Sequence, residues 1–543
     1  MENYDVIVLG TGASGLTAAL TAAGHGATVG LFEKGNEVGG TSAKSGGMIW
    51  IPGNHLMAPL GVSDSREEVL TYLQSLSHGM ILDELAEAFV DGGPEMLRWL
   101  EDNTPVRFEI VEQFPDYHPE NPGGKTGGGR SMECPLFAFG ELGEWAGRVV
   151  QGHQMGKHTV MNETTLGKGT TDHVDPVEVA RRVDGDLRGC GQALVGRLLK
   201  GCLDRGVVPK TNHRAVRLLV EDGAVIGVEF EVGEERKRAY SRRGVVLATG
   251  GFDWDPALVR SFIRGPLERS VAVETNSGDG LKMAMRIGAA LGNMREAWWV
   301  PIMDVVDEGQ PPKSWLVNRE RTRPRSIIVN RAGQRFTNEA VNYNAFGAAF
   351  HEMNTTSFAY SNLPAWLLFD QGYATSYGLA GRFRGEGPVP PWIKVAPTLE
   401  ELAGEIDVPA SALADTVARW NAISADGDDP DFGRGRSVND RWWGDPKKPG
   451  AETTLGPIDT GPFYAVQVRP GSLGTKGGPR TTESGQVLDV DEQPIAGLYA
   501  AGNVMASAMG MTYGGGGGTL APAMVFGFLS GRHAATASDR AKS

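Results

Sequence analysis

The chain has 543 residues, enough to bury a large core and to form more than one domain. Its formal net charge of −14, without a basic cluster, argues against nucleic acids and anionic membranes as partners. Three cysteines without metal-ligand spacing predict neither a metal site nor a disulfide framework, and they fit a reducing interior. No apolar run approaches the roughly 20 residues that span a bilayer, and strand-like sequence begins at Tyr4 with no signal peptide before it. We therefore expect a cytoplasmic protein, and peripheral contact with a membrane stays open.

The first 33 residues follow the order strand, glycine-rich turn, helix, strand and acid. An apolar run at 4–9 leads directly into Gly10-Thr11-Gly12-Ala13-Ser14-Gly15, and small residues at 16–23 favour a helix. A second apolar run, 28–32, ends at Glu33. This order is that of the β-α-β unit that binds the ADP half of a dinucleotide.

Each glycine of this turn has a physical role in such a unit. Gly10 permits the tight turn, Gly12 lets a pyrophosphate approach the backbone, and Gly15 lets helix and strand pack closely. The helix N-terminus offers free N–H groups and a positive dipole to the phosphates. The carboxylate of Glu33 can accept from both ribose hydroxyls and repel a 2′-phosphate. A dinucleotide cofactor restricts the chemistry to redox reactions.

Further along, residues 83–100 predict a helix that is interrupted at Gly92-Gly93-Pro94, and 113–130 predict a glycine-rich loop. Between residues 278 and 456, Asp279 can cap a helix over 280–291, and 327–330 predict a strand. A capping-box pattern, Thr398 with Glu401, predicts the start of the next helix. An apolar stripe at helical spacing follows and is interpreted as core; its residues are Leu413, Val417 and Trp420.

Two more strands end at glycine, as the first one does. A hairpin over 215–231 precedes a buried strand at 243–247 that runs to Gly250, and a strand at 494–500 runs to Gly502. Three strand-to-glycine junctions would meet at the carboxyl edge of one sheet, where open α/β sheets bind ligands.

The predicted fold class is therefore α/β, with a Rossmann-type nucleotide domain that is discontinuous in sequence. We expect this domain over 1–277 and 457–543, with an inserted α+β substrate or cap domain over 278–456. No second Gly-x-Gly-x-x-Gly follows a strand with an acid downstream, so a separate NAD(P) domain is not expected. One tightly held dinucleotide implies FAD, and the electrons must then pass to an external acceptor such as a quinone.

At this point the chain resembles a known superfamily over its whole length. The segments 10–33, 39–42, 248–251, 276–280 and 498–503 together resemble the flavoprotein superfamily of fumarate reductase and succinate dehydrogenase. Within it the chain is most similar to the 3-ketosteroid dehydrogenases, because of 114–119 with 122–124, 338–340 with Tyr343, and 511–518.

The resemblance implies an enzyme that removes two hydrogens next to a ring ketone, with 1,2-desaturation of a 3-ketosteroid as the main hypothesis. It implies that an α-proton passes to a tyrosine and a hydride to N5 of FAD. Tyr513 and the N–H of Gly517 match the pair that binds the ketone oxygen. Tyr343 matches the base and Tyr117 a supporting tyrosine; Tyr360, Tyr373 and Tyr377 are competitors for the base.

The residues expected to bind FAD are Gly10, Gly12, Ala13, Ser14, Gly15, Glu33, Lys34, Gly40, Thr41, Ser42, Gly46, Gly47, Ala215, Ala248, Thr249, Gly250, Asp279, Gly502, Asn503, Gly518, Thr519 and Leu520. Covalent-flavin relatives attach the cofactor through a histidine, and the segment 39–47 contains none, so we expect dissociable FAD.

Two physical points concern the proposed tyrosines. The family often has a proline between the oxygen-binding tyrosine and glycine, whereas this chain has only glycine at 514–518, which predicts a looser loop. A tyrosine base with an ordinary pKa of about 10 needs a positive or hydrogen-bonded environment, so we expect a basic optimum for activity. Other residues are interpreted as structural: Trp298 and Trp299 as packing, and His118, His351 and Arg325 as structural or surface groups.

Two alternatives remain open. One is a fumarate-reductase-like enzyme, which needs cations for carboxylates; the region after Met511 has no arginine before Arg532. The other is a flavin-bound protein without turnover. Within the ketone hypothesis, 4,5-desaturation of a 5α-3-ketosteroid and reaction on a smaller cyclic ketone also remain open.

Overall fold

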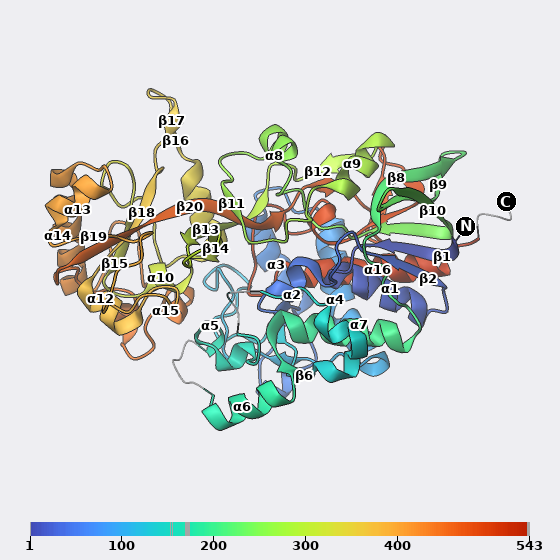
Figure 1. Ribbon diagram of the computed structural model, residues 1–543, viewed down its shortest axis with the longest axis horizontal. Coiled ribbons are helices and arrows are strands. Elements are labelled where there is room, and N and C mark those ends of the chain that lie inside the picture. The colour runs from blue at the N-terminus through green and yellow to red at the C-terminus, as the bar shows by residue number, and fades with distance from the viewer. Residues whose placement is uncertain (1, 153, 155, 169–173, 540–543) are drawn as a thin grey trace.

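The computed structural model describes residues 2–152, 154, 156–168 and 174–539. Two seven-stranded sheets organise it, one toward each end of the long axis of the molecule (Figure 1). The sheet that holds the N-terminal strand has the core order β2-β1-β10-β23-β22. Its members are β1 Glu2–Leu9, β2 Val29–Phe32, β10 Glu235–Leu247, β22 Gln486–Leu488 and β23 Pro494–Ala500.

Three neighbouring strands of this sheet end in glycine turns, as the sequence predicts. β1 pairs with β10 and β10 with β23, all in parallel register, so their carboxyl ends lie at one edge. Gly10, Gly250 and Gly502 follow these ends with φ values of 104°, 73° and 75°, which L side chains rarely adopt. The predicted hairpin is also present, as β8 Arg214–Glu221 and β9 Ala224–Val232, and it continues the sheet beyond β10.

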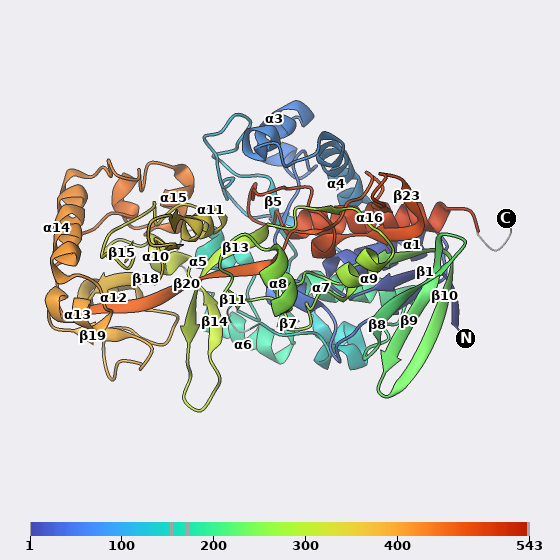
Figure 2. The same ribbon diagram turned by 90° about the horizontal axis from the view of Figure 1, so that it is seen from above.

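The first glycine turn brings helix and sheet into close contact. A Cβ at Gly15 would lie 2.0 Å from the carbonyl oxygen of Gly10, and a Cβ at Gly10 would lie 2.3 Å from that of Ala248. Helix α1 Ala13–Gly24 therefore begins directly against β1. It packs between α7 Cys190–Asp204 and α16 Leu520–Thr536, which Figures 1 and 2 show beside the sheet.

The second sheet has the order β14-β13-β20-β18-β15, with β11 and β19 also paired to β20. Its strands are β11 Arg269–Ser270, β13 Ala297–Val305, β14 Lys313–Leu316, β15 Ser326–Val329, β18 Ala365–Asp370, β19 Lys394–Ala396 and β20 Phe463–Thr475. Helices α13 Leu399–Glu405 and α14 Ala410–Asp426 cover its outer end (Figure 1). Thr398 caps α13, and the stripe of Leu413, Val417 and Trp420 lies in the core, as predicted.

Two predicted helices differ from the structure. Helix α4 Asp83–Asn103 is continuous through Pro94, because Gly92 packs against Val525 and Gly93 against Ile51, and tertiary packing outweighs their low helix propensity. Helix α9 runs only from Asp279 to Arg286. Its N-cap is Gly278, so Asp279 is not the cap but the first helical residue; its side chain is held by Lys34 instead.

Shorter elements complete the described chain. The helices are α2 Gly40–Lys44, α3 Arg66–Ser77, α5 Thr165–Lys168, α6 Pro176–Asp184, α8 Pro256–Phe262, α10 Arg319–Thr322, α11 Tyr343–Ala348, α12 Gln371–Tyr377 and α15 Val438–Trp443. The strands are β3 Ile49–Trp50, β4 Glu109–Ile110, β5 Ser131–Glu133, β6 Phe137–Ala138, β7 Leu187–Arg188, β12 Leu291–Gly292, β16 Met353–Asn354, β17 Ala359–Tyr360 and β21 Gly478–Pro479.

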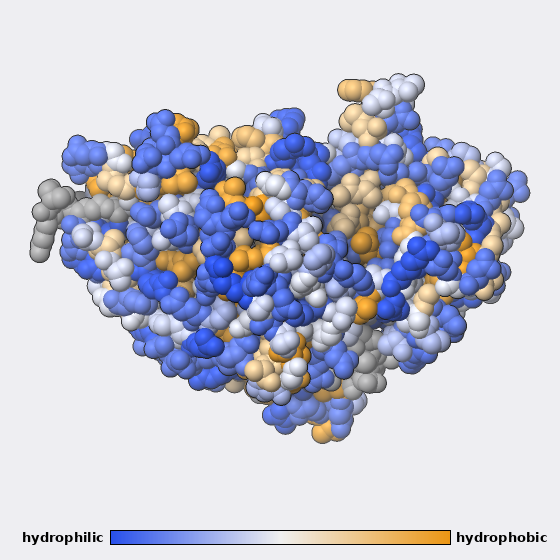
Figure 3. All heavy atoms as spheres, turned by 180° about the vertical axis from the view of Figure 1, so that it is seen from behind, coloured by the Kyte–Doolittle hydropathy of each residue, from blue (hydrophilic) through white to orange (hydrophobic). Residues whose placement is uncertain are grey.

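The surface seen in Figure 3 is mainly hydrophilic, with apolar side chains in small scattered groups. The β16–β17 hairpin projects from it, and Met353 and Phe358 are exposed there. Among the described residues, no helix combines the length and apolar character that crossing a membrane requires.

Candidate active site

One cavity contains nearly all the residues that the sequence singled out. Its lining includes the three glycine turns at the edge of the first sheet and also Tyr117, Tyr343 and Tyr513. All the residues expected to bind FAD line it except Ala13, Gly15 and Gly518. The backbone N–H of Ala13 is instead hydrogen-bonded to the Ser42 hydroxyl at 3.0 Å.

The acid at the end of β2 is held in place by the first glycine turn. One carboxylate oxygen of Glu33 accepts from the N–H and the hydroxyl of Thr11, at 3.0 and 2.6 Å, and the other accepts from the N–H of Gly35 at 2.8 Å. Lys34 then binds Asp279 at 2.9 Å, and Arg214 binds the same carboxylate. These bonds fix the groups that face the ribose end of a dinucleotide site.

The residues at the phosphate-binding turn fit an anionic dinucleotide. A Cβ built at Gly12 would have the Ser42 hydroxyl as its nearest neighbour, at 3.6 Å, so space is open for a ligand. Lys44, at the end of α2, also lines the cavity, and no hydrogen bond or ion pair within the described part of the chain includes it. Burial lowers the pKa of Lys44, since a buried cation without a partner is costly. Sequence reasoning missed Lys44; its position inside the 39–47 segment was the available signal.

Three tyrosines from distant parts of the chain meet in the cavity. The ring centroid of Tyr117 lies 5.4 Å from that of Tyr343 and 5.1 Å from that of Tyr513. The hydroxyls of Tyr117 and Tyr343 share a hydrogen bond of 2.8 Å, and the Tyr513 hydroxyl accepts from Thr519 at 2.8 Å. Since its oxygen accepts from Thr519, Tyr513 keeps its own proton for donation to a ligand.

Burial dominates the acidity of these phenols. It raises the pKa of Tyr343 well above its usual value, and the neighbouring phenols Tyr117 and Tyr513 add to the effect. Burial also raises the pKa of Tyr117 and of Tyr513. The hydrogen bond with Tyr343 and the charge of Arg321 oppose that rise at Tyr117. A base built from this pair is protonated at neutral pH and becomes active as pH rises.

The N–H of Gly517 is available beside Tyr513. Gly517 has φ 101°, and a Cβ there would lie 2.5 Å from the backbone of Ile49. No hydrogen bond within the described residues uses its N–H: Gly517 accepts from Ala521 through its carbonyl, and Gly518 donates to Gly515. Only glycine can therefore occupy this place in the cavity lining.

The glycine loop is not loosened by its lack of proline, which corrects the expectation from sequence. The carbonyl oxygen of Gly514 accepts from the Tyr72 hydroxyl at 2.7 Å and from the Tyr117 N–H at 3.0 Å. The carbonyl oxygen of Gly516 accepts from the Ser131 hydroxyl at 2.8 Å. The aromatic rings of Trp50 and Phe114 occupy the Cβ directions of Gly515 and Gly516, so packing fixes a backbone that side chains do not restrict.

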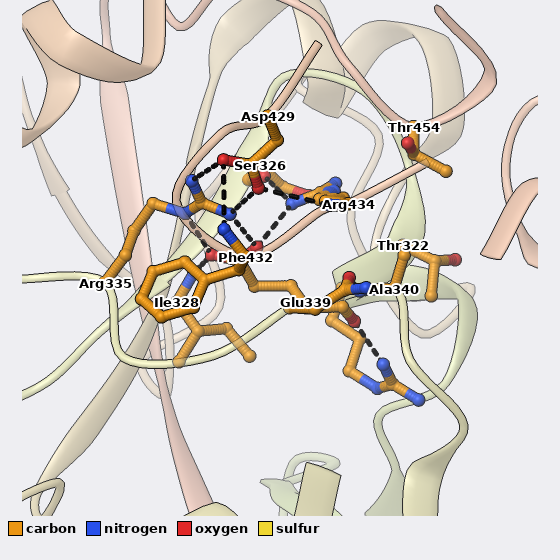
Figure 4. Close-up of polar contacts among 12 residues, drawn as sticks. Thr322, Ser326, Ile328, Arg335, Glu339, Ala340, Asp429, Phe432, Arg434 and Thr454 are labelled. Atoms are coloured by element: carbon orange, nitrogen blue, oxygen red, sulfur yellow. Dashed lines mark hydrogen bonds and ion pairs between the residues drawn. The ribbon is translucent and has the colours of Figure 1, made fainter. Parts of the chain in front are cut away.

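Tyr343 is held at its position by charged groups outside the cavity. Asn342 caps the short helix that begins with Tyr343. Just before it, the fully buried Glu339 forms ion pairs with Arg335 and with the fully buried Arg434, and Asp429 binds Arg335 at 2.9 Å (Figure 4). Removing one partner of such a cluster typically costs about 3–5 kcal/mol, so the backbone leading to Tyr343 is strongly constrained.

Two of the competing tyrosines have structural partners: Tyr373 donates to the carbonyl oxygen of Glu320 and Tyr377 to Asp445. Neither lines the cavity, and Tyr360, in β17, does not line it either. The residues interpreted as structural have partners, as expected. Trp298 packs edge-on against Tyr513 at 4.9 Å, and His351 packs against Trp299. Three other side chains also have partners: Arg325 pairs with Asp370, His118 lies beside Asn342, and Arg532 pairs with Glu95.

Sequence reasoning did not identify several further residues of the cavity lining. These residues are Met48, Met161, Leu166, Leu316, Trp443 and Leu473, with the polar Gln154 and Asn318. They come from many elements and have no shared spacing, so no local pattern separates them from ordinary core residues.

Comparison with known proteins agrees with this site. Residues 5–520 match the family described as "FAD binding domain". The chain belongs to this family. FAD is accordingly the cofactor, and the resemblance to the 3-ketosteroid dehydrogenases is confirmed by relatives that align over nearly the whole chain.

Two relatives and one solved structure illustrate the similarity. The chain is 41% identical to the 4-oxocyclohexanecarboxylate 2-dehydrogenase of Sinomonas cyclohexanicum, over 98% of this chain and 92% of that protein. It is 39% identical to the 3-oxosteroid 1-dehydrogenase of Mycobacterium tuberculosis, over 98% and 99%. The crystal structure of the 3-ketosteroid delta1-dehydrogenase of Sterolibacterium denitrificans with 1,4-androstadiene-3,17-dione superposes with a TM-score of 0.90 and 34% identity, over 98% and 100%.

Proposed function

We propose that this protein is an FAD-dependent dehydrogenase that introduces a C=C bond next to a ring ketone, with 1,2-desaturation of a 3-ketosteroid as its reaction. One observation supports this most: the Tyr513 hydroxyl and the unpaired N–H of Gly517 lie in the same cavity as the hydrogen-bonded pair Tyr117 and Tyr343. Two donors and one potential base are the groups that removal of a proton beside a ketone requires.

The two donors act on the ketone oxygen. As the α-proton leaves, negative charge builds on that oxygen, and Tyr513 and Gly517 stabilise it by hydrogen bonds that strengthen with the charge. Each donor of this kind is worth roughly 2.7–4 kcal/mol in comparable sites. The hydroxyl of Thr519, which donates to Tyr513 at 2.8 Å, orients that phenol.

Tyr343 takes the α-proton, and Tyr117 supports it. The two hydroxyls share a hydrogen bond of 2.8 Å, which holds the oxygen of Tyr343 in place. Burial and the neighbouring phenols raise the pKa of Tyr343, so it acts as a base only as pH rises. When bound, FAD would supply the acceptor for the hydrogen of the neighbouring carbon, which leaves as a hydride with its electron pair. The glycine turns, Glu33 and Lys44 hold FAD, and an external acceptor such as a quinone reoxidises it.

The division of the chain follows the same logic. We propose that 1–277 and 457–543 form the FAD domain and that 278–456 form the inserted substrate or cap domain. The topology of the first sheet, with β23 beside β10, supports the joining of the two terminal parts. Strand β20 pairs with both β13 and β18. Through this strand the chain returns from the inserted part. We further propose that the protein acts in the cytoplasm.

Two other substrates have specific support. The relative with 41% identity is named for a cyclohexanone carboxylate, which favours a smaller ring ketone as second candidate. A dicarboxylate has weaker support, because Arg532, the first arginine after Met511, pairs with Glu95 and does not line the cavity. The structure of the product tests whether the new double bond lies at C1–C2, as proposed, or at C4–C5.

One assay distinguishes these candidates. The holoenzyme is supplied with androstenedione, 4-oxocyclohexanecarboxylate and, with reduced viologen, fumarate, and the products are identified by mass spectrometry and NMR. The proposal predicts dye reduction with the steroid, a new C1–C2 double bond, and loss of at least about a hundredfold in turnover for Tyr513→Phe. Turnover only with fumarate, or full activity of Tyr513→Phe, contradicts it.

A further inference from the structure

A fully buried lysine lies behind the segment that holds Tyr513. Lys476 follows β20 and has none of its side chain exposed. Its Nζ donates to the carbonyl oxygen of Thr512 at 2.6 Å. Its own backbone is fixed on both sides, because its N–H donates to Glu296 and its carbonyl accepts from Ser507. The ammonium is therefore bonded to the peptide group that directly precedes Tyr513.

The indole ring of Trp298 contacts both the ammonium of Lys476 and the phenol of Tyr513. The Nζ of Lys476 lies 4.0 Å from the ring centroid of Trp298, and that ring packs edge-on against Tyr513 at 4.9 Å. The indole N–H of Trp298 donates to Asn503, which lines the cavity. The positive charge thus lies within about 9 Å of the Tyr513 ring, across a dry and densely packed layer in which charges are weakly screened.

The charge of Lys476 has no direct counter-ion in the described residues. Glu296 is the carboxylate whose charge acts on Lys476. Its oxygens are already bound by Arg264 at 3.0 Å and by the indole N–H of Trp299 at 3.2 Å. Lys476 faces Glu296 and Arg264 on one side and the Thr512–Tyr513 segment on the other. Burial lowers the pKa of Lys476 to about 7, so at the basic pH where Tyr343 acts the ammonium keeps its proton only if a nearby anion stabilises it. An anion that forms near this ammonium would be stabilised by it, and the ammonium in turn would hold its proton more tightly.

We propose that Lys476 is a positioning residue that holds the Tyr513 loop and directs an uncompensated positive charge toward the ketone oxygen. This inference rests on the proposed function, since it needs an oxygen that gains negative charge beside Tyr513. Lys476 does not touch the substrate; it acts through Thr512 and Trp298 on the residue that does.

The test separates charge stabilisation from simple support of the loop. Holoenzyme with Lys476→Met, and with Lys476→Gln as a second uncharged variant, is titrated with two ligands while the flavin absorbance is followed. One ligand is a neutral 1,4-diene-3-ketosteroid. The other is a steroid with a phenolic A ring, whose phenolate form resembles the charged oxygen of the transition state. Lys476→Arg, which keeps the charge, is the matched control.

The proposal predicts that both uncharged variants bind the phenol about tenfold more weakly and the neutral ketone within threefold of wild type, while kcat falls about tenfold at little changed KM. Lys476→Arg keeps the preference for the phenol. Equal weakening of both ligands assigns Lys476 to support of the loop alone and overturns the proposal, as does no change for either ligand. If neither uncharged variant folds with FAD, the charge serves folding and the proposal is also overturned. Wild-type protein that binds neither ligand contradicts the proposed function instead.

Discussion

Replacing Gly517 by alanine tests the oxygen-binding site at its most constrained point. The added Cβ would lie 2.5–2.6 Å from three backbone atoms of Ile49, and φ at this position is 101°. Backbone cannot move aside as the end of a flexible side chain can, so the segment must shift and turn its N–H away from the ketone oxygen. Loss of one such donor costs roughly 2.7–4 kcal/mol, which is about a hundredfold to a thousandfold in kcat.

The assay is steady-state dye reduction with a 3-ketosteroid, together with the FAD content and the melting temperature of each variant. Gly514→Ala is the control, because its Cβ would approach only the Trp50 ring, at 3.2 Å, and its φ is not in the left-handed region. We expect Gly514→Ala to keep most of its activity. A yellow, folded Gly517→Ala enzyme with kcat within fivefold of wild type would refute the role of this N–H.

Three further outcomes follow from the same site. Thr519→Val removes the hydroxyl that orients Tyr513, worth about 0.5–1.5 kcal/mol, and should lower kcat roughly threefold to tenfold, whereas Thr519→Ser should restore it. Because burial and the neighbouring phenols raise the pKa of Tyr343, kcat/KM should increase with pH from neutrality upward. Tyr117→Phe removes one of these phenolic hydroxyls, so its rising limb should move to lower pH, and an unmoved limb would contradict the pairing. Acid precipitation should release all of the FAD, and yellow colour left in the pellet would indicate a covalent link.

The sequence predicted the three glycine turns at the edge of the first sheet, because their signals are local. Gly10, Gly250 and Gly502 each follow an apolar strand, and the rule that parallel strands end at one edge brings them together. The same local reasoning erred at Gly92 and Gly93, which pack against residues far away in the chain.

The substrate end could be predicted only through resemblance. Tyr117, Tyr343 and Tyr513 have no shared spacing, and their meeting depends on the packing of both sheets. The rigidity of the glycine loop was missed for a similar reason: its constraint comes from Tyr72, whose hydroxyl binds the carbonyl oxygen of Gly514. Lys476 was missed as well, because nothing in the local sequence indicates that a lysine after a strand is buried.

The most direct measurement is a crystal structure of the FAD-bound enzyme with a 3-ketosteroid product. The account predicts that the ketone oxygen lies within about 3.2 Å of both the Tyr513 hydroxyl and the Gly517 nitrogen, with the Tyr343 hydroxyl beside the adjacent ring carbon. A ketone oxygen that binds elsewhere in the cavity, with Tyr513 still bonded only to Thr519, would contradict it.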